Sequence, residues 1–393
     1  MAANGFFWDI PVKMLFGPGC VKDIRKPEIK SLFPGSKAFL VTSAGNSLKS
    51  AGVIKDVVHS FETAETEVEI YDCITRNPDI SQVKDGIEKL RESGADFVVG
   101  LGGGSVMDAA ACIAGLAEEK EDDLWTFFFA GEKKPAKREG KGLPVIKIPT
   151  TAGGGNESLK TAYIVNEELG IKGEFTGDHP FVAVVDPELH VTVPHDVTAF
   201  GAFEALIQSL EGYISKKRTA PAQMMHIATL GNIAQFLVAA IEDGADMDAR
   251  EKLAFASSMS GLARQLGSTT GLQAVANAVT GSFRDVPHGA VLAICCTEYF
   301  KFFLDRNCCD EIFSEMAMSI GRAPLEPAEF LAGLEDLKEA AGLDELRLGD
   351  YDITVEDIPG LAKKACAGRG EFFRNDPLPM SEDDVKKLLE NCL

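Results

Sequence analysis

Three glycines and a serine lie between a short apolar segment and a helical pattern. Phe97–Leu101 is apolar enough to be a buried strand, and Gly103, Gly104 and Ser105 follow it. Glycines let a ligand approach the backbone, and the first N–H groups of a helix favour an anion. We therefore expect a phosphate here, with Ser105 as N-cap or donor and Asp108 as a capping group at the third helical position. The spacing is not G-x-G-x-x-G, so a tight turn that binds nothing is the alternative.

A second glycine turn follows a second candidate strand, residues 144–148. Thr150 and Thr151 precede Gly153–Gly155 and supply hydroxyl groups beside a flexible backbone. Taken alone, this segment is a flexible loop. Two such turns at the carboxyl ends of parallel strands predict a polar ligand, because open α/β sheets bind their ligands at that edge.

Short strand patterns alternate with helical patterns up to about residue 189. One helix is expected over Ile80–Ser93, where Val83, Ile87 and Leu90 recur at helical spacing. The expected strands are residues 38–42, 68–73, 97–101, 144–148, 161–165 and 181–185. This alternation predicts an α/β domain with a mostly parallel sheet covered on both faces.

From about residue 191 the strand pattern ends and Ala-, Leu- and Met-rich helices follow. They are expected at residues 199–215, 221–242, 249–267, 271–281 and 356–366. Their many small residues indicate close helix packing in a second, all-α domain. We therefore predict two domains, residues 1–189 and residues 190–393.

The composition excludes several classes of protein. The formal net charge of −21 disfavours binding to phosphate backbones, so nucleic acid is not an expected partner. No uninterrupted apolar run approaches the roughly 18 residues of a membrane span, and the N-terminus does not read as a secretory signal. The nine cysteines include no Cys-x-x-Cys pair, which fits a reducing compartment. We expect a cytoplasmic protein.

Both glycine turns match the signatures of a known family. GGGSVMDAA and IPTTAGGGNES resemble the GGGSxxDxAK and PTTAGTGSE motifs of the iron-containing alcohol dehydrogenases, and Val286–Gly289 adds a Pro-His-Gly motif. The resemblance covers nearly the whole chain. It implies a Rossmann-like, dinucleotide-binding α/β domain, an all-α helical domain and an active site in the cleft between them. It also implies a homodimer or a larger homo-oligomer.

The resemblance implies which residues hold the dinucleotide. The pyrophosphate would lie on the first glycine turn, Thr150 and Thr151 would border the adenine or the nicotinamide ribose, and Asn77 would close the pocket. Lys172 falls where the family has a ribose-contacting lysine, although a solvated loop lysine is an equal alternative. The strand at residues 38–42 ends at Ser43 without the acid that NAD-preferring enzymes place there. We therefore expect NADP(H) rather than NAD(H).

The metal-binding positions depart from the family. The family holds iron with an Asp, a His four residues later on the same helix, and two further histidines. Glu204 takes the Asp position and Gln208 the first His position; Ala274 takes the next, and only His288 is retained. Another active-site His of the family falls at Ala278. This donor set suits iron or zinc poorly, so we expect no metal.

Other interpretations of these residues stay open. Without the resemblance, Glu204 and Gln208 would be read as a solvated or locally hydrogen-bonded helix face, and His288 as a core histidine. His195 and His226 lie just outside the two ends of the first metal helix and are the remaining candidates for a replacement ligand.

The resemblance implies an NAD(P)-dependent oxidoreductase acting on a small alcohol and aldehyde, or on an oxo-acid. His288, Glu204 and Gln208 are the expected catalytic residues, with His288 or Glu204 donating a proton in place of the metal. One alternative is an inactive nucleotide-binding homologue with a regulatory or assembly role. Another is a lyase or cyclase related to dehydroquinate synthase, which needs a metal and is therefore disfavoured by the missing ligands.

Overall fold

The computed structural model describes residues 4–131, 134–323, 326–368 and 370–393. The chain forms two compact units. The α/β unit comprises Ile10–Thr151 and Asn156–Val193. The helical unit comprises Pro194–Leu393, the loop Ala152–Gly155 and the described part of Met1–Asp9. The loop 152–155 therefore belongs to the helical unit, although both of its neighbours in sequence belong to the α/β unit.

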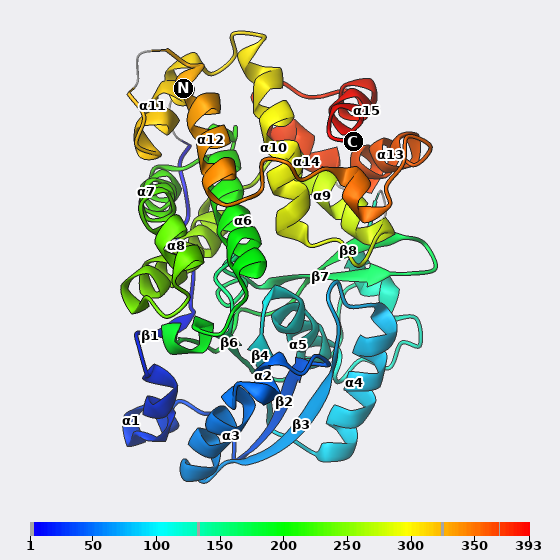
Figure 1. The fold of residues 1–393 in the computed structure, drawn as a ribbon. Helices are drawn as coiled ribbons and strands as arrows, with labels where there is room; N and C mark the ends of the chain where they lie inside the picture. Colours follow the sequence, from blue (N-terminus) through cyan, green and yellow to red (C-terminus); the bar gives the residue numbers. More distant parts are fainter. Residues whose placement is uncertain (1–3, 132–133, 324–325, 369) are drawn as a thin grey trace. The chain divides into compact units, whose positions relative to one another are not determined.

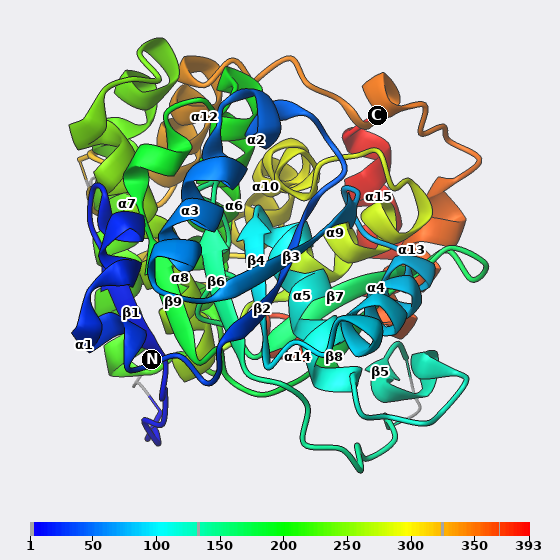
Figure 2. The same ribbon diagram turned by 90° about the horizontal axis from the view of Figure 1, so that it is seen from below.

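Six parallel strands form the main sheet of the α/β unit, in the order β1-β9-β6-β4-β2-β3 (Figure 2). Their bounds are β1 Lys13–Phe16, β2 Lys37–Ser43, β3 Glu67–Ile74, β4 Phe97–Gly102, β6 Val145–Pro149 and β9 Val182–Val185. The predicted parallel α/β fold is confirmed. The first strand, β1, was not expected from the sequence, because it is short and only partly buried.

Helices cover both faces of this sheet. The helices of the unit are α1 Pro27–Lys30, α2 Ser47–Ser50, α3 Val53–Thr63, α4 Ile80–Ser93 and α5 Gly104–Leu116, with 3-10 helices η1 Cys20–Arg25, η2 Leu124–Phe127 and η3 Pro187–His190. Side chains alternate along β2, as strand geometry requires. Ala38 and Leu40 share a core with α3, whereas Phe39 and Val41 share a core with α4 and α5.

A second, smaller sheet is antiparallel. It has the order β5-β8-β7, with β5 Phe128–Phe129, β7 Thr161–Asn166 and β8 Ile171–Thr176. The expected strand at residues 161–165 therefore lies outside the parallel sheet. Only four residues separate β7 from β8, which is enough for a hairpin but too few for a parallel crossover. The strand β8 was not predicted.

The helical unit is built around one large core, and Figure 1 labels most of its helices. Its helices are α6 His195–Ile214, α7 Ala220–Glu242, α8 Met247–Leu266, α9 Gly271–Ser282, α10 His288–Leu304, α11 Asp310–Ser319, α12 Glu329–Ala340, α13 Ile358–Gly368, α14 Gly370–Asn375 and α15 Glu382–Asn391, with 3-10 helix η4 Leu348–Tyr351. The helix α6 is buried almost from end to end. Its side chains are therefore fixed by neighbours on several sides, which suits a helix that positions polar groups.

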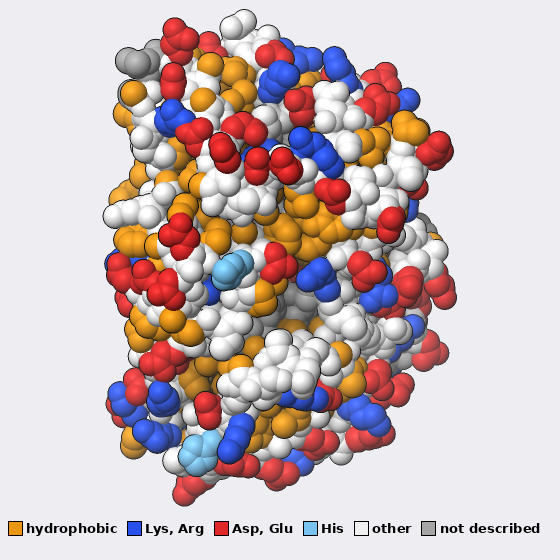
Figure 3. All heavy atoms as spheres, viewed as in Figure 1, with side chains coloured by type: hydrophobic (Ala, Val, Ile, Leu, Met, Phe, Trp, Pro, Cys, Tyr) orange, Lys and Arg blue, Asp and Glu red, His pale blue; other side chains and the backbone are white. Residues whose placement is uncertain are grey.

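Two surface properties bear on the expected surroundings of the protein. Acidic side chains are distributed over the face shown in Figure 3, in keeping with the net charge of −21. Among the described residues, α7 alone is long and apolar enough to cross a membrane by length and composition. One third of its most apolar window is buried within the protein, and core helices of soluble proteins meet the same criterion.

Candidate functional site

The first glycine turn joins β4 to α5, and no side chain forms a capping hydrogen bond at the start of the helix. β4 ends at Gly102, Gly103 is the N-cap residue, and α5 begins at Gly104. A Cβ atom on Gly102 would lie 2.7 Å from Cγ2 of Val106, so only glycine permits this approach of strand and helix. Because Gly103 has no side chain, the first N–H groups of α5 are available to an anion such as a phosphate.

Two details of the predicted turn are wrong. Ser105 is the second residue of α5 and not its N-cap, and Asp108 lies in the second turn of the helix, beyond the third position. The helix begins earlier than predicted because glycine itself serves as the N-cap. The Ser105 hydroxyl instead accepts a hydrogen bond from the backbone N–H of Asn77 at 3.2 Å.

Asp108 connects the turn to the segment after β6. Its Oδ1 accepts from Nδ2 of Asn156 at 2.8 Å and its Oδ2 from the backbone N–H of Tyr163 at 3.0 Å. Burial raises the pKa of Asp108, and the charge of nearby Lys147 acts in the opposite direction. Lys147, fully buried in β6, donates to the carbonyl groups of Asn156 at 2.8 Å and Leu159 at 3.0 Å. This cluster holds the first glycine turn in place, and Lys147 was not predicted from the sequence.

Three predicted cofactor residues lie together beside the turn. Asn77 is buried and has a left-handed backbone, with φ of 44°. Its side-chain Oδ1 accepts from Nζ of Lys172 at 2.9 Å, and its backbone N–H reaches Ser105. Lys172 lies on β8, so it is held by a strand and is not a solvated loop lysine.

The predicted threonines also lie at this edge of the sheet. The backbone N–H of Thr150 donates to the carbonyl of Gly102 at 3.0 Å, and Thr150 is buried. Oγ1 of Thr151 would lie 3.2 Å from a Cβ atom on Gly103. Ser43 is the last residue of β2, which neighbours β4 in the sheet. Ser43, the first glycine turn and the two threonines thus follow or end the neighbouring strands β2, β4 and β6 at their carboxyl ends.

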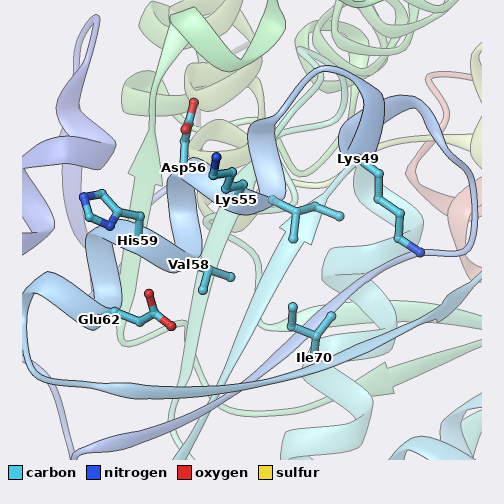
Figure 4. A pocket seen from close by; sticks show the side chains of 8 residues that line it. Lys49, Lys55, Asp56, Val58, His59, Glu62 and Ile70 are labelled. Carbon is cyan, nitrogen blue, oxygen red and sulfur yellow. The ribbon is translucent and has the colours of Figure 1, made fainter.

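A groove of about 560 Å³ is lined by residues of α2, α3 and β3 (Figure 4). Its lining residues carry charges of both signs; they are Lys49, Ile54, Lys55, Asp56, Val58, His59, Glu62 and Ile70. Lys49 also forms an ion pair with Asp72 on β3. The end of β2 therefore has a carboxylate on the adjacent strand, which the local sequence after Ser43 does not reveal.

In the helical unit, the second glycine turn packs closely against α6 and α8. A Cβ atom on Gly201 would lie 2.2 Å from the carbonyl oxygen of Ala152, and one on Gly261 would lie 2.3 Å from that of Gly155. The backbone N–H of Gly153 donates to Oγ of Ser257 at 2.9 Å. These contacts fix the loop 152–155 on the two helices.

Glu204 and Gln208 both face this loop from α6, as expected for residues four apart. The carboxylate of Glu204 lies beside Gly153, since Oε2 would be 3.2 Å from a Cβ atom there. Nε2 of Gln208 donates to the carbonyl of Gly154 at 3.0 Å and to Oγ of Ser260 at 2.8 Å. Both N–H bonds of the Gln208 amide are thereby used. Gln208, which stands where the family has a histidine ligand, therefore holds the loop 152–155 and Ser260.

His288 is half-buried and is the first residue of α10. Its Nε2 lies 3.0 Å from Oε1 of Gln273, whose Nε2 donates to Oε2 of Glu211 at 2.8 Å. Burial raises the pKa of Glu211 to about 7, against four hydrogen bonds that lower it. The sequence analysis singled out neither Gln273 nor Glu211. The sequence signal that could have found Glu211 is a charged residue within an apolar stretch of the helix that also carries Glu204.

The donor atoms at the family's metal positions do not fit a transition metal. Ala274 and Ala278 are buried and offer methyl groups. The amide nitrogen of Gln208 donates to protein acceptors. The remaining side chains that commonly bind transition metals are the carboxylate of Glu204 and the imidazole of His288. Within residues 4–131, 134–323, 326–368 and 370–393, no group of three or more His, Cys, Asp or Glu side chains could hold a metal ion.

The two other histidines considered as ligands lie elsewhere. His195 is exposed at the start of α6. His226 is fully buried on α7, where burial lowers its pKa to about 3 and keeps it neutral. A Cβ atom on Gly212 of α6 would lie 2.2 Å from its Nε2, so His226 fills a space between two helices.

Family models match both halves of the chain. Residues 11–187 match the model described as iron-containing alcohol dehydrogenase. Residues 198–393 match the C-terminal model of the Fe-containing alcohol dehydrogenase family.

Several proteins of known activity are similar over most or all of the chain. The 1,3-propanediol dehydrogenase of Klebsiella pneumoniae is 28% identical over 400 residues, with 100% of each chain covered. The choline dehydrogenase of Bacillus subtilis is 32% identical over 290 residues, covering 73% of this chain and 70% of that protein.

Solved structures agree with these matches. An archaeal halo-thermophilic alcohol dehydrogenase from a Red Sea brine pool, bound to NZQ, has a TM-score of 0.91 and 29% identity, with both chains fully covered. The sulfoacetaldehyde reductase of Bifidobacterium kashiwanohense, in complex with NAD⁺, has a TM-score of 0.82 and 27% identity, with 99% of each chain covered.

Proposed function

Because the chain belongs to the iron-containing alcohol dehydrogenase family, we propose that it is an NAD(P)-dependent oxidoreductase. It transfers a hydride from a small alcohol to the oxidised nicotinamide cofactor, or from the reduced cofactor to the corresponding aldehyde. An oxo-acid is the alternative carbonyl substrate. The observation that carries this proposal is the first glycine turn, where a helix start without a side-chain cap carries Ser105, which is linked through Asn77 to Lys172. Relatives named as propanediol and choline dehydrogenases support the substrate class.

The residues of the α/β unit bind and orient the dinucleotide in this proposal. The N–H groups of Gly104 and Ser105 bind the pyrophosphate, and Asp108 holds the turn without touching the ligand. Lys172 and Asn77 contact a ribose, with Thr150 and Thr151 at the adjacent strand end. When bound, the nicotinamide supplies the hydride. We assign these roles to the domain at residues 1–189 and the reacting carbonyl to residues 190–393.

A carbonyl must gain a proton when it accepts a hydride, and in this chain a side chain supplies it. His288 is our primary candidate, because it is the one histidine retained at the family's active-site positions and an imidazole can act as a general acid. Glu204 is the second, since its carboxylate lies at the glycine turn that follows Thr151 in the chain. Gln208 positions that turn through Gly154. The reaction proceeds without iron or zinc, because the donor set of the chain does not suit them.

Two observations bear on the choice of cofactor in opposite directions. Ser43 is followed by small residues and Lys49, which leave room and charge for a 2′-phosphate and favour NADP(H). The ion pair between Lys49 and Asp72 reduces that positive charge and places a carboxylate near the same strand end. We retain NADP(H) as the preferred cofactor. Equal or tighter binding of NADH in a fluorescence titration would contradict this choice.

A second candidate function is an inactive nucleotide-binding homologue with a regulatory or assembly role. One observation favours it: Gln208 is committed to Gly154 and Ser260, at a position where the family binds its metal. We further propose that the protein is cytoplasmic, forms a homodimer or larger homo-oligomer, and binds neither nucleic acid nor membranes.

Dinucleotide binding and aldehyde turnover together distinguish these functions. Fluorescence titration with NADH and NADPH measures binding, and oxidation of the reduced cofactor over a panel of small aldehydes measures turnover. Gly104→Val should weaken binding by at least about tenfold, because its side chain fills the start of α5. Gly360→Ala is the control, as no atom lies within 4 Å of that Cβ position.

Each outcome selects one interpretation. Binding with turnover supports the oxidoreductase. Binding without turnover of any aldehyde supports the inactive homologue. Absence of binding by the wild-type protein contradicts both.

A further inference from the structure

Two buried carboxylates hold the start of α9, the helix that carries Gln273. Oε1 of Glu211 accepts from the backbone N–H groups of Thr270 at 3.3 Å and Gln273 at 3.2 Å. Oδ1 of Asp376 accepts from the backbone N–H of Gly271 at 2.8 Å and from the hydroxyl of Tyr299 at 2.8 Å. These contacts satisfy N–H groups that every helix start leaves without an internal partner. They account for one oxygen of each carboxylate.

The second oxygen of Glu211 has a different partner. Oε2 accepts from the side-chain Nε2 of Gln273 at 2.8 Å. The Gln273 amide is thereby oriented, because its donor end must face the carboxylate and its Oε1 must face the other way. That Oε1 lies 3.0 Å from Nε2 of His288. An amide oxygen only accepts, so Nε2 of His288 carries the hydrogen of this bond.

We propose that Gln273 is a positioning residue for His288, and that Glu211 orients Gln273 for this role. The contact selects the tautomer with hydrogen on Nε2 and fixes the plane of the ring. This inference rests on the proposed function, in which His288 donates a proton to the carbonyl.

The start of α9 is held by backbone contacts that do not need the side chain of Gln273. Its backbone N–H donates to Oε1 of Glu211 at 3.2 Å whatever the side chain is. The side chain instead joins Glu211 to the imidazole, because its Nε2 donates to Oε2 of Glu211 and its Oε1 lies 3.0 Å from Nε2 of His288. Losing the first bond removes a donor from a buried carboxylate and costs stability, whereas losing the second acts on the imidazole. The tautomer of His288 therefore distinguishes the positioning role from a structural one.

Gln273→Met tests the proposal, because methionine keeps the length and shape of the side chain but removes both hydrogen bonds. Thr229→Val is the matched control; Oγ1 of Thr229 donates to backbone carbonyl groups on α7 and α8, remote in the network from His288. For Gln273→Met we expect kcat to fall about 10- to 100-fold, by analogy with the loss of a partner that orients a metal-ligating histidine. We expect KM for the cofactor to change less than about twofold. The control should leave kcat within about twofold.

The tautomer of His288 is measured by NMR, independently of enzymatic activity. Protein labelled with ¹⁵N in its six histidines gives the proton position on each ring by long-range ¹H–¹⁵N correlation, and His288→Ala assigns the His288 signals. We expect the neutral His288 ring of the wild-type protein to carry hydrogen on Nε2. In Gln273→Met, the signals should shift towards those of a tautomer mixture, and in Thr229→Val they should not move.

The outcomes separate this inference from the proposed function. A wild-type protein that binds dinucleotide but turns over no aldehyde contradicts the proposed function. It also contradicts any role of Gln273 in that reaction. An active wild-type protein whose kcat and His288 signals are unchanged by Gln273→Met contradicts the positioning role alone. A wild-type ring with hydrogen on Nδ1 also contradicts it.

Discussion

Replacing Glu211 with Gln should flatten the pH dependence of stability. The pKa of Glu211 is raised from 4.5 to about 7, first because the carboxyl group is buried. The folded protein therefore holds this proton more tightly than the unfolded chain, so stability is greatest at low pH and falls as pH rises from about 4.5 to about 7. A shift of this size corresponds to about 3 kcal/mol in full. Between about pH 5.5 and about pH 8 the loss amounts to about 2 kcal/mol.

Urea unfolding followed by circular dichroism measures the effect at these two pH values. The stability of the wild-type protein should decrease by about 2 kcal/mol more than that of Glu211→Gln over this range. Asp376 titrates in the same direction, because burial raises its pKa; the charge of Glu211 raises it further, so Glu211→Gln also removes that part of the Asp376 shift and flattens the pH dependence in the same sense. Glu242→Gln, at an exposed glutamate that ends α7, is the control and should follow the wild type. Identical pH dependence in the wild-type protein and Glu211→Gln would refute the reasoning.

Three further predictions follow from the same structure. His288→Ala should lower aldehyde turnover by roughly 10² or more while dinucleotide binding, measured by fluorescence, stays nearly unchanged; unchanged turnover would remove His288 from the reaction. Asp108→Ala should destabilise the protein by about 3 kcal/mol and weaken dinucleotide binding, because it leaves Asn156 and the backbone N–H of Tyr163 without their acceptor and removes one of the two carboxylates near the buried Lys147; wild-type melting and binding in this variant would contradict the support role. Gly155→Ala should lower stability by more than about 2 kcal/mol in urea unfolding, since φ is +70° and a Cβ atom would lie 2.4 Å from the Ser257 carbonyl oxygen. Its control, Gly231→Ala on α7, has open space around the Cβ position and should gain about 0.5–1 kcal/mol; equal effects of the two changes would contradict the close packing of the loop.

The parallel sheet could be predicted because its strands have simple patterns. β2 and β4 are continuous apolar runs, as expected for strands covered on both faces, and α4 has its apolar residues at helical spacing. The hairpin of β7 and β8 was missed in part, because Ile171–Thr176 contains Lys172, Gly173 and Glu174 and does not read as a strand. Its order comes from pairing with β7, which is a tertiary effect.

The site could be predicted where a motif marks it. The first glycine turn and its neighbours Asn77 and Lys172 follow from the family motifs, and the structure brings them together. Gln273 could not be found in this way. Its importance depends on a contact with His288 that spans 15 residues and on Glu211 from a third helix, and no local pattern records either contact.

The most direct test of the central claim is turnover by protein whose metal content is known. Elemental analysis by mass spectrometry is made on tag-free protein before and after treatment with a strong chelator, and oxidation of NADPH and NADH by small aldehydes is then followed in each sample. The account predicts no stoichiometric iron or zinc and turnover that survives the chelator, because Ala274 supplies no donor and Gln208 is held by Gly154 and Ser260. One tightly held transition metal per chain, or activity that is lost on chelation and restored by iron, would contradict it.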